Sequence, residues 1–125
     1  MKSEYSYDHA RFDFFLTNNS KPCMLEVKSC TLVKDGKALF TDAVTIRGRK
    51  HLETLAEAKA KGYRVYVLFI VQRIDASIFS PNDELDPKFG EALREAARKG
   101  VEVHAYYSEF ARNKIVLRGK LKAEL

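Results

Sequence analysis

The first half of the chain alternates short hydrophobic runs with turn residues, a pattern typical of β-strands. The runs lie at residues 11–16, 23–33 and 38–40. Turn residues separate the first two runs, and Asp35 followed by Gly36, a strong hairpin signal, lies between the second and the third. Because strands joined by such short turns pair in opposite directions, we expect an antiparallel meander over this half.

The second half begins with a helical pattern that leads into a continuous hydrophobic run. Apolar residues spaced three and four positions apart around Leu52 predict a helix that Asp42 or Thr45 caps and that ends at Gly62. The run at residues 64–71 is apolar after its first residue and has the length of a strand. We therefore expect this strand to be buried on both faces of a sheet.

A second helix and a further strand follow. Asp86 and Pro87 are residue types that open helices, and Gly100 is the type that ends them. Residues 101–107 then predict a strand, and residues 115–117 predict a short edge strand after it. The two strands that this helix joins should be parallel, with a right-handed crossover. The expected fold class is α/β (α+β), with helices on a mixed central sheet in which an antiparallel meander is followed by a βαβ unit.

Length and composition are those of one folded domain. The 125 residues match a typical domain, and a content of 46% hydrophobic and 31% charged residues excludes intrinsic disorder. The longest apolar run, at residues 65–71, is far shorter than the roughly 20 residues of a membrane-spanning helix. The N-terminal residues contain no apolar signal segment. We expect a single domain over residues 1–125 in the cytoplasm, without membrane association.

Net charge and cysteine spacing give limited information about the binding partner and about disulfides. A net charge of +5 permits a polyanionic partner such as nucleic acid but does not require one. Cys23 and Cys30 fall in one predicted strand, where their Cα atoms would be too far apart for a disulfide. We expect two free, buried thiols in a reducing compartment.

Asp13, Glu26 and Lys28 are the candidate catalytic residues. Glu26 and Lys28 share one face of their predicted strand, and pairing with the preceding strand can bring Asp13 to within about 5 Å of Glu26. Two carboxylates this close favour a divalent cation such as Mg²⁺ between them. Lys28, about 6–7 Å further along the strand, can hold a phosphate oxygen or help deprotonate a water molecule. These are the parts needed to hydrolyse a phosphodiester.

A solvated sheet face is the competing interpretation. An acid followed two positions later by lysine occurs four times in the chain, and the other three occurrences fall on a turn, a helix surface and a helix cap. Only Glu26 and Lys28 lie inside an apolar strand that follows another strand with an acid. The pattern by itself leaves both interpretations open.

Basic residues crowd the first turns of the first predicted helix. These are Arg47, Arg49, Lys50 and His51. Cations at a helix N-terminus oppose the helix dipole at a cost of about 0.3–1 kcal/mol each, and a bound phosphate would favour the same arrangement. They are therefore candidate nucleic-acid contacts, with a solvated basic face as the alternative.

Three further polar residues are candidates for the site. Gln72 and Arg73 directly follow the buried strand, where open α/β sheets usually place ligands, so Arg73 can contact phosphate or pair with a surface acid. Asp42 can contribute a third acid, although a helix cap is the simpler interpretation.

Longer stretches of the sequence resemble the sugar fermentation stimulation protein A (SfsA) family. The resemblance covers the chain from about Glu4 onward, and the run around residues 42–52 is its most specific part. The matching stretches are residues 11–14, 25–32, 39–52, 69–73, 79–81, 86–87 and 101–106. Family members combine an N-terminal OB-like domain with a restriction-endonuclease-like domain of the PD-(D/E)xK type. This chain looks like the second domain alone.

The resemblance implies roles for the acidic residues and the lysine. Asp13 matches the first metal-binding acid of the motif, Glu26 the second and Lys28 its lysine, and Glu4 lies where another acid is often supplied. The family is associated with DNA binding and with a proposed regulatory role in sugar metabolism, and its fold implies nuclease activity. Two positions depart from the family pattern, with Ile46 in place of a glutamate and Thr41 in place of a proline.

These observations lead to one principal hypothesis and two alternatives. The principal hypothesis is a Mg²⁺- or Mn²⁺-dependent nuclease domain that binds nucleic acid, DNA in the first place, and the sequence is also compatible with a homodimer. One alternative is a DNA-binding regulator that keeps the nuclease fold without turnover, which the missing acid at Ile46 favours. The other is a protein-interaction domain with vestigial acids.

Overall fold

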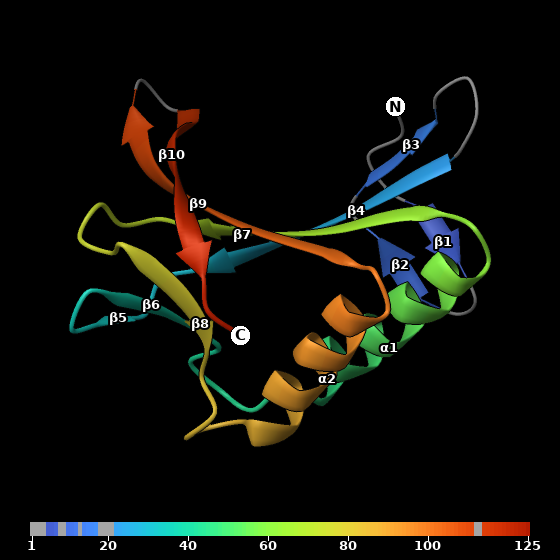
Figure 1. Ribbon diagram of the computed structural model, residues 1–125. Helices are drawn as coiled ribbons and strands as arrows, with labels where there is room; N and C mark the ends of the chain where they lie inside the picture. The colour runs from blue at the N-terminus through green and yellow to red at the C-terminus, as the bar shows by residue number, and fades with distance from the viewer. Residues whose placement is uncertain (1–4, 8–9, 13, 18–21, 112–113) are drawn as a thin grey trace.

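The computed structural model describes residues 5–7, 10–12, 14–17, 22–111 and 114–125, and the side chains of residues 23–109 and 116–125 (Figure 1). These residues form ten strands and two helices. In chain order they are β1 (Tyr5–Tyr7), β2 (Ala10–Phe12), β3 (Phe14–Thr17), β4 (Pro22–Cys30), β5 (Val33–Lys34), β6 (Lys37–Phe40), α1 (Ile46–Ala60), β7 (Arg64–Val71), β8 (Ile78–Pro81), α2 (Pro87–Arg98), β9 (Glu102–Ala111) and β10 (Lys114–Ala123).

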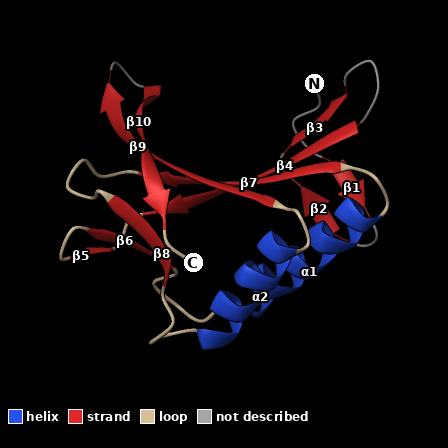
Figure 2. Cartoon of the chain, in the orientation of Figure 1, coloured by secondary structure: helices blue, strands red, loops and turns tan. Residues whose placement is uncertain are grey.

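Eight of these strands form one curled mixed sheet in the order β3-β4-β7-β9-β10-β8-β6-β5, and β1 pairs with β2 separately. Figure 2 shows both helices on the same face of this sheet, side by side. At the centre, β7 pairs in parallel with β4 on one side and with β9 on the other. The expected mixed sheet with helices packed on it is therefore confirmed, as is the parallel pair joined through the second helix.

The predicted meander is present only as separate antiparallel pairs, one of which is β1 with β2. β3 pairs with β4, and β5 pairs with β6 through a turn in which Asp35 and Gly36 both have positive φ. The strand expected at residues 23–33 ends at Cys30, and β6 lies at the far side of the sheet against β8. The reason is that β7 takes the place beside β4 and pairs with its whole length from Cys23 to Cys30.

Two further strand predictions need correction. The short edge strand expected at residues 115–117 is the start of β10, a ten-residue strand in the interior of the sheet between β9 and β8. Its second part alternates charged residues with Leu121, which is buried, so it carries no continuous hydrophobic run. In β7, Arg64 is exposed, and from Val65 to Val71 buried residues alternate with half-buried ones, because both helices lie on one face of the sheet.

The core lies between the helices and the sheet. Leu52 and Leu55 of α1 pack with Phe89 and Leu93 of α2, and all four side chains have no exposed surface. Burying a side chain of this size contributes about 1.5–3 kcal/mol, so this layer holds the helices on the sheet. Among the described residues, no helix has the length and apolarity needed to cross a membrane.

The two cysteines are free thiols, as expected, but only Cys30 is buried and Cys23 is half-buried. Cys30 is buried, and its Sγ atom lies 3.3 Å from the carbonyl oxygen of Leu39 in β6. Burial raises the pKa of the Cys30 thiol to about 11, so the thiol stays protonated and unreactive near neutral pH.

A single buried carboxylate joins the N-termini of both helices. Asp86 caps α2 by accepting a hydrogen bond from the Phe89 amide at 3.1 Å, and its second oxygen accepts one from the Thr45 amide at 2.8 Å. Thr45 in turn caps α1 by accepting a hydrogen bond from the Gly48 amide at 2.9 Å. Both helix starts are thereby tied together, and Thr45 rather than Asp42 is the cap of α1.

Replacing Asp86 with alanine should lower the free energy of unfolding by about 2–4 kcal/mol, since it removes a helix cap and leaves the Thr45 amide without its acceptor. Urea denaturation followed by circular dichroism measures the change. The matched control is Asp83→Ala, which removes an exposed acid that pairs with Arg94 at the surface, where such pairs contribute about 0–1 kcal/mol. An equal decrease in the free energy of unfolding in the two variants would contradict the proposed role of Asp86 in joining the two helix N-termini.

Candidate functional site

Glu26 lies on the helix-covered face of β4. It is only 5% exposed and shares this face with Met24 and Cys30, which are both buried hydrophobic residues. Taking a carboxylate out of water costs several kcal/mol, so a carboxylate in this position needs compensating contacts. The alternative of a solvated sheet face therefore does not apply to Glu26.

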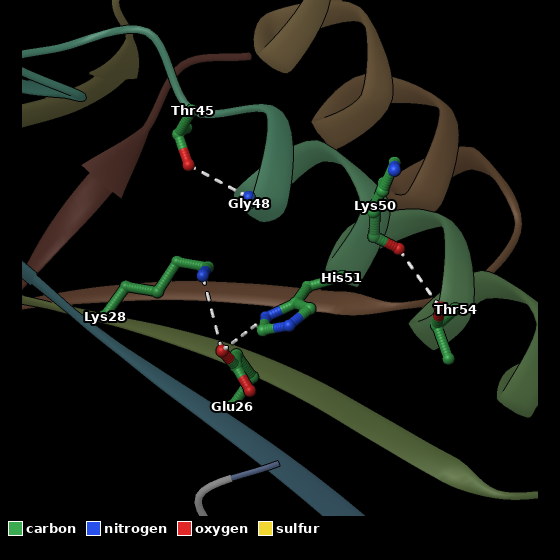
Figure 3. Close-up of polar contacts among 7 residues, drawn as sticks. All are labelled: Glu26, Lys28, Thr45, Gly48, Lys50, His51 and Thr54. Carbon is green, nitrogen blue, oxygen red and sulfur yellow. Dashed lines mark hydrogen bonds and ion pairs between the residues drawn. The ribbon is translucent and has the colours of Figure 1, made fainter. Parts of the chain in front are cut away.

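Two basic side chains converge on one oxygen of Glu26 (Figure 3). The Nζ atom of Lys28 lies 3.3 Å from Oε1, and the Nδ1 atom of His51 lies 3.5 Å from the same oxygen. Both partners are themselves largely buried, with side chains 12% and 15% exposed. The ammonium of Lys28 also lies 5.9 Å from the centre of the Phe40 ring, a cation–π contact that helps to hold the side chain in place.

The other oxygen of Glu26 has no hydrogen-bond partner among the described residues. Oε2 is buried and has no hydrogen-bond donor within the described part of the chain. An unpaired buried acceptor costs about 1–3 kcal/mol, and more when it is charged. A bound cation is the kind of ligand that would remove this cost.

A small pocket opens at this carboxylate. Its volume is about 250 Å³, enough for several water molecules at roughly 30 Å³ each or for a hydrated ion. The lining residues are Glu26, Val27, Lys28, Thr45, Arg47, Gly48 and His51. The pocket therefore lies between strand β4 and the N-terminal turns of α1.

The start of α1 is shaped to lie close to this pocket. Gly48 is buried, and a Cβ atom in its place would lie 2.8 Å from the Thr45 hydroxyl and 3.2 Å from the Phe89 ring. No acidic residue occurs in the first turn of this helix. Within that turn no carboxylate offsets the positive end of the helix dipole, and the anion that lies at this helix start is Asp86, which binds the Thr45 amide.

The basic residues predicted to bind nucleic acid are divided between two sides of α1. Arg47 lines the pocket and is exposed, and His51 lines it on its inner side. Lys50 is exposed and points away from Glu26 in Figure 3. Arg49 is half-buried and lines a larger groove of about 880 Å³ between α1 and α2, which contains neither Glu26 nor Lys28.

The residues predicted after β7 lie outside the pocket. Arg73 binds Asp75 through two hydrogen bonds of 2.9 and 2.6 Å, which hold the pKa of that carboxyl below its usual value. Gln72 donates a hydrogen bond of 3.0 Å to the Ser29 hydroxyl. Asp42 is exposed and does not line the pocket.

Two predicted acids lie outside the described residues, namely Asp13 and Glu4. Phe14, which follows Asp13 in the chain, pairs with Leu25 of β4. Leu25 directly precedes Glu26. Within the described part of the chain, no three His, Cys, Asp or Glu side chains are grouped so that they could hold a metal ion.

The contact between His51 and Glu26 is the feature that sequence reasoning missed. We expected His51 to bind nucleic acid with its basic neighbours. A signal was present, because His51 is spaced three positions after Gly48 and four before Leu55, both of which are buried. This spacing puts it on the helix face that packs on the sheet.

Comparisons with known proteins agree with this architecture. The sequence model described as "Sugar fermentation stimulation protein RE domain" matches residues 1–114. The sugar fermentation stimulation protein homolog of Caldanaerobacter subterraneus subsp. tengcongensis is 46% identical over 125 residues, which are 100% of this chain and 55% of that protein. The homolog of Symbiobacterium thermophilum is 47% identical over 131 residues, which cover 100% of this chain and 52% of that protein.

A solved structure shows the same fold. The structure of Pyrococcus furiosus SfsA in complex with Ca²⁺ matches with a TM-score of 0.92 and 29% sequence identity, over 100% of this chain and 55% of that one. The chain thus spans about half the length of the relatives that it matches. On the family match and these identities, the chain belongs to the sugar fermentation stimulation protein (SfsA) family.

Proposed function

We propose that this chain is a divalent-cation-dependent nuclease domain that cleaves phosphodiester bonds in nucleic acid, DNA in the first place. The observation that carries the proposal is the buried carboxylate of Glu26, whose Oε2 atom has no partner among the described residues and which borders a pocket also lined by Lys28. An oxygen ligand, a lysine and a helix N-terminus together suit a cation and a phosphate group.

The donor atoms at the site fit a hard divalent cation. Mg²⁺ and Mn²⁺ prefer oxygen ligands and are commonly held by one or two carboxylates together with water and substrate phosphates. We propose Glu26 and Asp13 as these carboxylates, with Glu4 as a further acid. The related Pyrococcus furiosus protein binds Ca²⁺, which has the same preference for oxygen. When bound, such an ion supplies positive charge that polarises the phosphate ester and favours the loss of a proton from water.

The residues around Glu26 would bind and orient the reacting groups. Lys28 holds Oε1 of the carboxylate, and its ammonium lines the pocket, from which it can also stabilise charge on a phosphate oxygen. Arg47 at the pocket entrance and the positive end of α1 would bind the phosphate on the other side. Lys50 and Arg49 would extend the contact along the strand of nucleic acid, and Arg73 would do so once released from Asp75.

Cleavage of nucleic acid is the direct test of this proposal. Plasmid, single-stranded DNA and RNA are incubated with the protein in Mg²⁺, Mn²⁺ or EDTA. We expect cleavage with at least one of the ions and none in EDTA. The cleavage rate of Glu26→Ala should be lower by about 100-fold or more, since the substitution removes a charged group that binds the reacting centre.

The matched control for this test is Glu57→Ala. Glu57 has the same spacing to a lysine as Glu26 but lies exposed on α1, outside the pocket. Cleavage that persists in Glu26→Ala would come from another site or from a contaminant. Binding without cleavage of any substrate would instead favour the DNA-binding regulator.

The salt dependence of binding tests the basic residues of α1. Removing a side chain that neutralises one phosphate lowers the slope of log K against log salt concentration by about 1. We expect this change for Arg47→Ala, Arg49→Ala and Lys50→Ala, measured by fluorescence anisotropy with a DNA oligonucleotide. Lys122→Ala is the control, because Lys122 is an exposed lysine on β10, a strand that lies between β9 and β8 in the sheet. Unchanged slopes in the α1 variants would show that these residues do not contact the nucleic-acid phosphates.

A further inference from the structure

We infer that His51 is a positioning residue that, with Lys28, holds one oxygen of Glu26 so that only the other oxygen is presented to a cation. The inference rests on the cation site of the proposed function, but not on nuclease activity. It gives His51 a role different from the nucleic-acid contact that its basic neighbours suggest.

The geometry around the carboxylate is asymmetric. Lys28 Nζ and His51 Nδ1 lie 3.3 and 3.5 Å from Oε1, whereas Oε2 is buried without a partner among the described residues. The two basic groups come from different elements, Lys28 from β4 itself and His51 from α1 (Figure 3). A carboxylate held from two directions at one oxygen cannot rotate freely about its last bond.

Burial strengthens the contacts that hold Oε1. Glu26 is 5% exposed, so water competes little for Oε1, and polar contacts away from water are stronger than those at the surface. Nδ1 is the imidazole nitrogen that faces Oε1, at 3.5 Å, and the ammonium of Lys28 faces the same oxygen at 3.3 Å. Oε1 is thus occupied, and Oε2 is the remaining atom of Glu26 that can bind a cation.

One available oxygen favours particular cations. Mg²⁺ and Mn²⁺ fit a site in which a carboxylate contributes a single oxygen and water completes an octahedron, whereas Ca²⁺ accepts both oxygens of one carboxylate. By occupying Oε1, His51 and Lys28 discourage the two-oxygen mode. Loss of His51 should therefore weaken Mn²⁺ binding more than Ca²⁺ binding.

The chain contains a matched histidine for comparison. His104 Nε2 lies 3.5 Å from Glu102 Oε1, the same separation as in the His51 pair, but the side chains are 31% and 50% exposed. Neither of these residues lines the pocket at Glu26. A surface pair of this kind should have no effect on a cation bound there.

Isothermal titration with Mn²⁺ alone, and then with Ca²⁺ alone, tests the inference on the full chain. We expect His51→Ala to weaken Mn²⁺ binding by about tenfold or more, as is typical when a residue that orients a metal ligand is removed. His51→Asn, which keeps a nitrogen donor near Oε1, should recover most of this affinity. His104→Asn should leave it unchanged. Circular dichroism and melting temperatures in EDTA show whether each variant is folded.

Several outcomes would overturn the inference. These are wild-type protein that binds no Mn²⁺, folded His51→Ala with affinity within about threefold of wild type, or folded His51→Asn as weak as His51→Ala. If His51→Ala does not fold, His51→Leu, which fills the space without a nitrogen, takes its place in the comparison with His51→Asn. The expected Mn²⁺ pattern without any cleavage of nucleic acid would leave the inference standing and remove the nuclease proposal alone.

Discussion

The site depends on a charged carboxylate placed on the core-facing side of a strand. Along this face of β4, Met24 and Cys30 are buried hydrophobic residues, and Glu26 interrupts them. Burial of an ion costs several kcal/mol, and contacts with Lys28 and His51 recover part of that cost at one oxygen. The second oxygen is buried and has no hydrogen-bond partner in the described part of the chain, so a positively charged partner there would lower the cost of its burial.

This arrangement works only if α1 begins at the right place above β4. Asp86 fixes that place, because its two oxygens accept hydrogen bonds from the amides of Phe89 in α2 and of Thr45 at the start of α1. Gly48 then lets the first turn approach Phe89 closely. The cap of the second helix and the walls of the pocket are therefore parts of one connected structure, although these residues are far apart in the sequence.

Local signals explain the parts of the fold that could be predicted. The strand at Arg64–Val71, the cap at Asp86 and the Asp35-Gly36 turn each depend on residues close together in the chain, and all were predicted correctly. Thr45 was one of the two caps predicted for α1. The positions of β6 and β10 depend instead on which distant strand offers the better partner. No local sequence pattern indicates which distant strand becomes the neighbour, so the positions predicted for both strands in the sheet were wrong.

The same division holds for the candidate site. Sequence alone determined that Glu26 and Lys28 share a strand face, because side chains alternate strictly along a strand. Only the tertiary structure decided that this face is the one the helices cover and that His51 turns inward to Glu26. The physical reason is that periodicity sets the direction of a side chain within its own element, whereas its partner and its exposure to water depend on how distant elements pack together.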